Sequence, residues 1–551
     1  MQNRNNAAHL LTTALVLLTS LQVISAAPPK GRGPGSATPP KLIVGIAIDQ
    51  LRTDYLEALR DRMTDGGFNR LLRQGRVYEQ VTFDLDNPDA TAALAVLATG
   101  AYPFRNGVPA QQVYDTRMAR RQSVFYDPAQ HGINTVDGLS PRSLISTTLA
   151  DELKTASLGA ARVYAIAPDA EAAILAGGHT ANGVLWLDDR GGKWASSDYY
   201  PDFPAFVTDQ NSSQPFFLNV KKAVWEPLAQ AEGPLDIMPY RYAASSPFAH
   251  KFFYHGLPCY TWLKTSPFVN DAVLQISERL LQDKQLGARK HTDMLQLTFY
   301  AGTYLHERPE LYAEELQDIY LRLDQTIATL LDLIDRSVGL DNTYIYMVGT
   351  GATCGHASSA DVEGTRLGEF NAHRCTALLN AHLISLYGKA QWIAGYDNGH
   401  IFLNHDAIEA QRLKVSEVQQ AAAEFVAMMK GVDEVVTNHQ LLHEDFSERI
   451  VSRRNAYHKH TGGDLLLSLQ PGWVLKADEG AEPQPQVRHD VAPGPAILFA
   501  PKAVAPARIS VPVQATHIAP TVAHSLRIRA PSACREPALT EPVQSEPARP
   551  E

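Results

Sequence analysis

Short apolar runs, each ending at a polar residue and followed by a helical pattern, constrain the fold of this chain more than any other feature. The first run is Lys41 to Ile48 (KLIVGIAI), which ends at Asp49. A nearly continuous apolar and β-branched run of this length is typical of a strand buried on both faces of a parallel sheet. Four later runs have the same character: Val163 to Ala167, Met294 to Phe299, Thr343 to Val348 and Ala496 to Phe499.

The clearest helix is predicted over Ala313 to Ser337, because its apolar residues recur at spacings of three and four. Strands that alternate with such helices predict an α/β fold, with a parallel sheet covered on both faces. In these sheets, ligands bind at the carboxyl ends of the strands. Asp49, Gly302 and Thr350 lie at or just beyond three of those ends, so we expect a functional site there.

Residues 1–26 have the layout of a secretory signal peptide. Arg4 precedes an apolar run from Leu10 to Ile24, which meets small residues at Ser25-Ala26-Ala27. Residues 27–40, rich in Pro and Gly, are expected to form a flexible linker. We therefore expect a periplasmic or secreted protein with no transmembrane segment after signal cleavage. An uncleaved N-terminal anchor is the alternative.

Residues 41–535 are expected to form one domain with two insertions, at about 177–289 and 361–486. Such insertions either line the site edge of an α/β core or pack at its periphery. The tail, residues 536–551, is dense in Pro and Glu and is expected to be disordered. The formal net charge of −10, without a long basic run, argues against a nucleic-acid partner.

The first insertion is rich in aromatic residues, which admit two interpretations. They could form a face that binds carbohydrate or another envelope polymer, or they could be ordinary core. The residues in question are Trp186, Trp194, Tyr199 and Tyr200.

Six segments of the chain, taken in order, carry a family resemblance: KLIVGIAIDQLRTDYL, GGFNRLLRQGRVYEQ, ATGAYPFRNGV, YLRLDQTIATLLDLID, GGDLLLSLQPGW and THIAPTVAHSLRIRAPSAC. They resemble the alkaline phosphatase superfamily, and most closely its bacterial phosphomonoesterases, which are akin to type I phosphodiesterases and nucleotide pyrophosphatases. The resemblance runs from about Lys41 to Leu539. It implies a doubly wound α/β/α sandwich with cap insertions. In active members it also implies a two-zinc phosphate ester hydrolase with a Thr or Ser nucleophile and six Asp or His metal ligands.

The nucleophile and the phosphate clamp of these enzymes are not matched here. Counting back from Thr99-Gly100 places the nucleophile at Ala90, and only a one-residue deletion would move it to Thr91. The clamping Asn falls on Gln111, whose amide donates from a different depth. Thr91 and Gln111 are therefore vestigial catalytic candidates at most, and Thr91 is better explained as a hydroxyl at a helix start.

A second clamp, a Lys-Asp-Arg triplet in the similar phosphomonoesterases, aligns with Asp169-Ala170-Glu171. Two cations are thus replaced by two anions. At an effective dielectric constant near 20, a pair of unit charges about 4 Å apart interacts by roughly 4 kcal/mol. We therefore expect these carboxylates to oppose the binding of a phosphate ester strongly.

The implied metal ligands are mostly absent. Asp49 and His306 match one ligand of each zinc, and they are the vestigial metal candidates. The other four positions hold residues that do not ligate zinc in this way: Gly302, Thr350, Gly351 and Pro493. Zinc sites need three or four protein ligands, so the two-zinc site is expected to be lost.

Three nearby residues offer other readings of the site. A shifted loop could bring His356 or His489 inward and rebuild a metal site, and zinc is expected as a cofactor only in that case. Cys354, two residues before His356, is weak support for Cys/His catalysis. Without a metal, Asp49 is interpreted as a cap of the following helix and His306 as a hydrogen-bonded loop residue.

Two functional hypotheses follow. The first is an exported pseudoenzyme, with no intact catalytic residues and no cofactor, that acts as a binding or structural subunit with a protein partner in the cell envelope. The alternative is a metal-dependent phosphatase or phosphodiesterase with a rebuilt site.

Overall fold

The structure is a computed structural model of the chain. It describes residues 39–86, 89–213, 222–229, 234–239, 248–254, 257–307, 309–351, 368–443, 447–470, 472–476, 484–485 and 492–540. The predicted signal peptide, most of the predicted linker and residues 541–551 of the predicted tail lie outside them. Among the described residues, no helix combines the length and the apolar character needed to cross a membrane.

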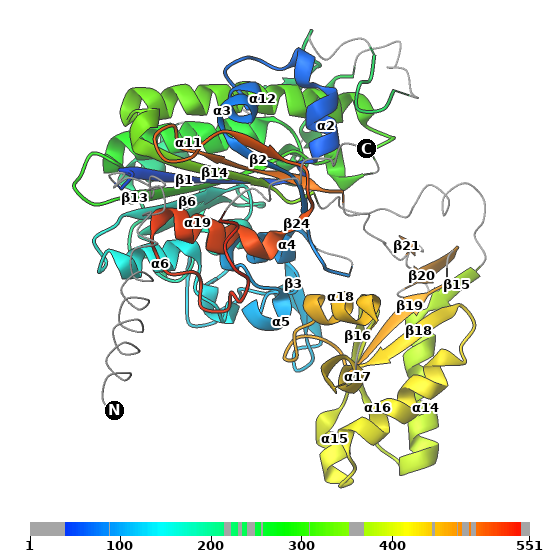
Figure 1. The fold of residues 1–551 in the computed structure, drawn as a ribbon. Helices are drawn as coiled ribbons and strands as arrows, with labels where there is room; N and C mark the ends of the chain where they lie inside the picture. The colour runs from blue at the N-terminus through cyan, green and yellow to red at the C-terminus, as the bar shows by residue number, and fades with distance from the viewer. Residues whose placement is uncertain are drawn as a thin grey trace, which may run out of the picture. The chain divides into compact units, whose positions relative to one another are not determined.

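A mixed central sheet organises the fold (Figure 1), with strand order β23-β2-β22-β14-β1-β13-β6-β7-β8-β5 and β24 paired to β2. Its strands are β1 (Leu42–Asp49), β2 (Arg76–Thr82), β5 (Gly132–Ile133), β6 (Val163–Ala167), β7 (Gly183–Leu187), β8 (Trp194–Ser197), β13 (Asp293–Tyr300), β14 (Thr343–Gly349), β22 (Gly494–Phe499), β23 (Ala507–Ile509) and β24 (Val513–Gln514). Strands β14, β1, β13 and β6 are mutually parallel neighbours. The α/β fold class is therefore confirmed.

Helices cover both faces of this sheet, as predicted. One face packs against α2 (Thr53–Ala58), α3 (Phe68–Gln74), α11 (Phe268–Lys284) and α12 (Ala313–Ser337). The other packs against α4 (Ala90–Thr99), α6 (Leu149–Ala156), α7 (Ala170–Gly177) and α19 (Ile518–Leu526). Helix α12 has the bounds that its periodicity predicts, and its apolar side is buried in the first of these two cores.

Strand β22 runs antiparallel to both of its neighbours, where the sequence predicts a parallel strand. The chain leaves the sheet at the end of β14 and returns beside the same end, because Gly494 lies against the Gly349 carbonyl. A strand that starts where its neighbour ends must run back along it. An apolar run shows that a strand is buried, but it carries no information about direction.

The predicted first insertion, 177–289, is too wide. Strands β7 and β8 belong to the central sheet, and α11 covers one of its faces. Trp186, Trp194 and Tyr200 are each 3% exposed, so these aromatic residues are core and form no carbohydrate-binding face. The elements outside the sheet are α8 (Ala205–Ser213), β9 (Val224–Trp225), β10 (His250–Lys251), β11 (Phe253–Tyr254), β12 (Leu257–Pro258) and α10 (Tyr260–Lys264).

Residues 368–476 lie within the predicted insertion 361–486 and contribute no strand to the central sheet. They build a four-stranded sheet, β16-β17-β19-β18, and most of a three-stranded sheet, β15-β20-β21, around a separate hydrophobic cluster. Its elements are β15 (Gly368–Asn371), α14 (Ala372–Tyr387), β16 (Ile393–Asp397), β17 (His400–Leu403), α15 (His405–Ala410), α16 (Val415–Ala427), β18 (Val432–Thr437), α17 (Asn438–His443), α18 (Glu448–Ala456), β19 (Leu465–Leu469), β20 (Trp473–Lys476) and β21 (Gln484–Pro485).

The folded chain continues beyond residue 535, where the domain is predicted to end. The Ser532 amide donates to Thr147 Oγ1 at 2.7 Å, and the Leu539 amide donates to Thr521 Oγ1 at 2.8 Å. These bonds fasten residues 531–540 along α6 and α19. A Pro-rich composition therefore placed the boundary several residues early, because side-chain hydroxyls of the core supply the partners that this segment lacks within itself.

Candidate functional site

A cleft of about 1260 Å³ opens at the carboxyl ends of β1, β13 and β6 and is walled on one side by residues of the second insertion. Asp49, Thr91, Gln111, Asp169 and His306 all line it. The positions predicted from the strand ends thus lie together in one cleft. The insertion contributes residues of strands β17 and β19. The remaining walls come from α10 and from β3 (Gln112–Asp115), which forms a hairpin with β4 (Arg120–Ser123).

Asp49 is held at the floor of the cleft by Thr350, one of the positions where the similar enzymes have a metal ligand. Thr350 Oγ1 donates to Asp49 Oδ1 at 3.1 Å and accepts from the Gln50 amide at 2.8 Å. Burial raises the pKa of Asp49 to about 7, the bond from Thr350 opposes this, and the nearby Asp169 carboxylate raises it further. A neutral hydroxyl therefore satisfies a carboxyl group that the similar enzymes use to hold a metal ion.

Gly302, the second of these positions, has no room for a side chain. A Cβ atom at Gly302 would lie 2.5 Å from Gln50 Cδ and 2.5 Å from Tyr300 Oη. Gln50 is 2% exposed, so its amide is packed into the floor rather than extended into the cleft. An aspartate at this position would meet the Gln50 side chain first.

The neighbouring Gly351, at the end of β14, is closed in a different way. Its φ of +60° lies in the left-handed region, and a Cβ atom there would come within 3 Å of the Ala492 carbonyl oxygen and the Gly494 nitrogen. A histidine ligand at this position would therefore meet main chain, which cannot rotate away. Pro493, which stands where the late His of the family would be, is part of that same main chain.

His306 lies at the opposite end of this floor, in the short turn Tyr304–His306. Its Nδ1 atom is 3.2 Å from Tyr300 Oη, and the same hydroxyl donates to the Thr303 carbonyl at 2.7 Å. The side chain of His306 is exposed. The hydrogen-bonded loop histidine expected from the sequence describes this geometry.

Helix α4 starts at Ala90, the position that counting back from Thr99-Gly100 aligns with the nucleophile of the similar enzymes. Asp89 caps the helix by accepting from the Thr91 amide at 2.7 Å, and it also accepts from the Gln111 amide at 3.1 Å. Thr91 itself is 6% exposed. A helix amino terminus attracts anions through its unpaired N–H groups, and here a carboxylate of the chain already occupies that position.

The Gln111 side chain turns to Glu171 rather than standing ready for a phosphoryl oxygen. Gln111 Nε2 donates to Glu171 Oε2 at 3.3 Å, and Ser123 Oγ donates to Glu171 Oε1 at 2.6 Å. Burial raises the pKa of Glu171, while the bond from Ser123 lowers it. The two residues that align with a phosphate clamp are therefore bonded to each other.

Asp169 is paired with Lys264, a residue that no sequence motif marks. Lys264 Nζ lies 2.9 Å from Asp169 Oδ1 and 2.5 Å from Asp189 Oδ1, and the lysine side chain is 8% exposed. Burial lowers the pKa of Lys264, but the two carboxylates outweigh it and raise the pKa above its usual value. Asp169 is thus less repulsive than an isolated carboxylate, and the one cation beside it is committed to two aspartates.

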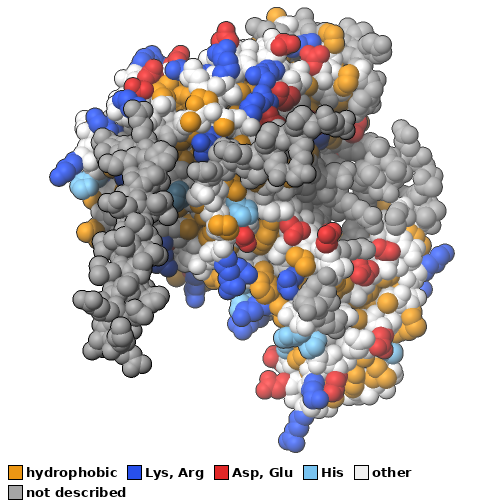
Figure 2. Space-filling view, in the orientation of Figure 1, with side chains coloured by type: hydrophobic (Ala, Val, Ile, Leu, Met, Phe, Trp, Pro, Cys, Tyr) orange, Lys and Arg blue, Asp and Glu red, His pale blue; other side chains and the backbone are white. Residues whose placement is uncertain are grey.

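The charge of the cleft is one-sided. The described residues that line it include seven aspartates but only two Lys or Arg side chains, Lys264 and Arg453. Arg453 bridges the insertion to the core by donating to Asp86 at 2.9 Å and to Glu434 at 2.8 Å. Figure 2 shows Asp and Glu side chains on the visible face of the molecule, in the region between the β24 and β18 labels of Figure 1.

The residues present do not fit the two zinc ions that the fold family implies. In the described part of the chain, no three His, Cys, Asp or Glu side chains come together in a way that could hold a metal ion. The space at Gly302 is filled by Gln50, and the space at Gly351 by main chain. His356, His489 and Cys354, considered above for a rebuilt site, lie outside the described residues.

The sequence profile of the type I phosphodiesterase / nucleotide pyrophosphatase family matches residues 43–494. The chain is 28% identical to a protein named calcium-transporting ATPase from Myroides odoratus, over 90% of this chain and 93% of that protein. It is 26% identical to alkaline phosphatase PhoV of Synechococcus elongatus, over 91% of this chain and 92% of PhoV. The crystal structure of wild-type alkaline phosphatase PafA superposes with a TM-score of 0.75 at 24% identity, covering 92% of this chain and 99% of PafA. That likeness concerns the fold.

Proposed function

Because the chain belongs to the type I phosphodiesterase / nucleotide pyrophosphatase family of the alkaline phosphatase superfamily, we propose that it is a non-hydrolytic member of that family. It is exported to the periplasm or secreted, and it serves as a binding or structural subunit in the cell envelope. In this proposal the protein retains the fold and the cleft of the family but does not hydrolyse phosphate esters.

The observation that carries this proposal is the state of the helix α4 terminus. Ala90 has no atom that attacks phosphorus, and the Asp89 carboxylate occupies the amide groups at the helix start. In an active member of the superfamily, the attacking hydroxyl and the phosphoryl group both need this position. The hydrogen-bonded Gln111–Glu171 pair and the ion pairs of Lys264 support the same conclusion, since carboxylates of the chain already engage these donors.

A metal and activity measurement tests the proposal directly. We expect the purified mature chain to contain less than one equivalent of zinc by plasma mass spectrometry, and to show no zinc-dependent turnover of p-nitrophenyl phosphate or its diester. Two zinc equivalents together with zinc-dependent turnover would show that the site is rebuilt, as the alternative hypothesis holds. In that case Asp49→Ala should abolish the activity, and a catalytically intact Asp49→Ala variant would exclude Asp49 from it.

Inorganic phosphate is expected not to bind in the cleft. A ligand that binds only the folded state raises the melting temperature, so phosphate should raise it no more than chloride at equal ionic strength. The physical reason is the surplus of aspartates over basic side chains in the cleft. A phosphate-specific rise that saturates, and that is lost in Lys264→Met, would contradict this expectation.

A further inference from the structure

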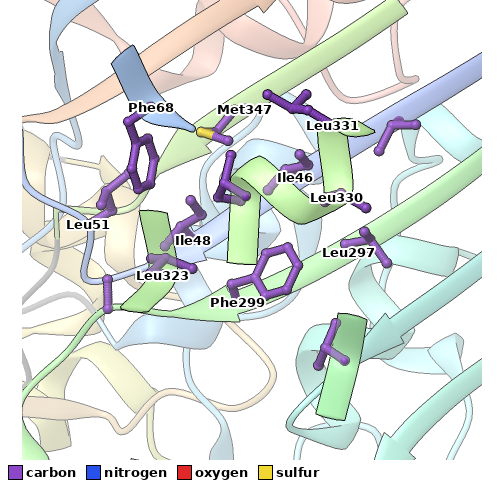
Figure 3. Packing of buried hydrophobic residues seen from close by; sticks show 14 of the residues in the cluster. Ile46, Ile48, Leu51, Phe68, Leu297, Phe299, Leu323, Leu330, Leu331 and Met347 are labelled. Atoms are coloured by element: carbon purple, nitrogen blue, oxygen red, sulfur yellow. The ribbon is translucent and has the colours of Figure 1, made fainter. Parts of the chain in front are cut away.

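Gln50 directly follows the strand-end Asp49 and adopts a left-handed backbone conformation, with φ of +62°. For a residue with a side chain, this conformation is unfavourable by roughly 1–2 kcal/mol. Ile48, two residues before it, and Leu51, directly after it, hold it there, because both side chains are fully buried in the core against the face of α12. Figure 3 shows Ile48 close to Leu323 and Phe299, and Leu51 beside Phe68, in this packing.

The main-chain groups of Gln50 are fastened as well. Its amide donates to Thr350 Oγ1 at 2.8 Å, and its carbonyl accepts from Tyr320 Oη at 3.3 Å. With both groups fixed, the side chain is directed at Gly302, one of the positions that align with a metal ligand of the family. There its amide lies against Gly302 and donates a hydrogen bond to the Asp49 carboxyl group.

We propose that the side-chain amide of Gln50 stands in the place of the missing metal ions, holding the Asp49 carboxyl group and filling the floor of the cleft. Gly302 is then the partner of Gln50, because only a residue without a Cβ atom leaves room for that amide. The inference rests on the proposed function, since it describes how a member without metal keeps the floor of its cleft intact. A consequence is that the lost zinc ligands cannot be restored one at a time. Restoring an aspartate at position 302 does not by itself restore a metal site, because Gln50 fills the space.

A double-mutant cycle between positions 50 and 302 tests this coupling. Gly302→Ala is expected to lower the melting temperature by a few degrees, since the new methyl group meets Gln50 and Tyr300 Oη. In the Gln50→Gly background, where the amide is gone and the backbone strain is relieved, the same substitution should lower it by clearly less. Tyr300→Phe added to that background removes the remaining contact and should reduce the loss further.

Gly66→Ala is the matched control, because the nearest atom to its Cβ would be Ala328 Cβ at 3.6 Å, an ordinary contact. It should leave the melting temperature unchanged. If Gly302→Ala gives no soluble protein, recovery of soluble protein in Gln50→Gly/Gly302→Ala is the same coupling measured another way. Equal effects of Gly302→Ala with and without Gln50 would overturn the inference.

Metal titration supplies the second readout, which does not depend on activity. Cobalt(II) absorption should detect no tight site in Gly302→Asp. Gln50→Gly/Gly302→Asp, with His306 and Asp49 retained, should bind cobalt measurably better than either single variant. Tight binding by Gly302→Asp alone would contradict the inference while leaving the proposed function of the natural chain standing. Two zinc ions in the natural chain would instead refute the proposed function, whatever the cycle shows.

Discussion

Substituting histidine for Gly351, to restore the residue that the similar enzymes carry there, is expected to destabilise the fold by about 3 kcal/mol or more. Two independent effects add. The backbone of Gly351 has a φ of +60°, and its Cβ position falls within 3 Å of main-chain atoms of Ala492 and Gly494. Those atoms start strand β22, so they cannot move without disturbing the central sheet. Urea unfolding followed by circular dichroism measures the loss.

Two alanine variants separate these effects. Gly159 also has a positive φ, of +82°, but no atom lies within 4 Å of its Cβ position. Gly159→Ala should therefore show only the conformational effect, about 1 kcal/mol, whereas Gly351→Ala should show that effect together with the steric one. Equal losses in the two alanine variants would show that the approach of residues 492–494 to Gly351 is not a constraint.

Replacing Asp49 with asparagine is expected to stabilise the protein by up to about 4 kcal/mol near pH 8. The pKa of Asp49 is raised from 3.8 to about 7, with burial as the main cause. Below pH 4 the carboxyl group is protonated in both the folded and unfolded states, so it imposes no penalty. As the pH rises from 4 to 7, the unfolded chain ionises first, and stability falls. Above pH 7 the full penalty remains.

Asparagine keeps an oxygen that accepts from Thr350 and removes the charge. The gain should therefore be large at pH 8 and small at pH 4, measured as the free energy of unfolding across that range. Asp65→Asn is the control, because the Asp65 side chain is 87% exposed. A loss of stability at pH 8 in Asp49→Asn would point to a bound metal at Asp49, since removing a ligand would then remove the binding energy of that metal.

The secondary structure near the site follows from local sequence, and for this reason it could be predicted. Strands β1, β6, β13 and β14 are apolar runs with no competing interpretation, and α12 has a repeat that only a helix buries. The direction of β22 and the membership of β7 and β8 in the sheet depend on where distant segments meet. Hydrophobic pattern alone does not contain that information.

The location of the site could be predicted from the sequence, but the hydrogen bonds and ion pairs between its residues could not. Asp49, Gly302 and Thr350 were found because strand ends converge, and all three lie together. Lys264 was missed because its ion pairs are with Asp169 and Asp189, far from it in sequence, and nothing in its own segment sets it apart. Gln50 was missed for a subtler reason. Its importance comes from its left-handed backbone angle and from the absence of a side chain at position 302. Neither feature can be read from the residue type of Gln50.

The order of strands in the central sheet also determines how long β1 must wait during synthesis before its neighbouring strands are made. Strand β1 is made first, yet its neighbours β13 and β14 start at Asp293 and Thr343. At about 5–20 residues per second, a ribosome needs roughly 12–50 s to travel from Leu42 to Asp293. Throughout that interval an apolar strand waits with both edges unpaired, a state prone to aggregation. A nascent chain built this way gains from a holding chaperone.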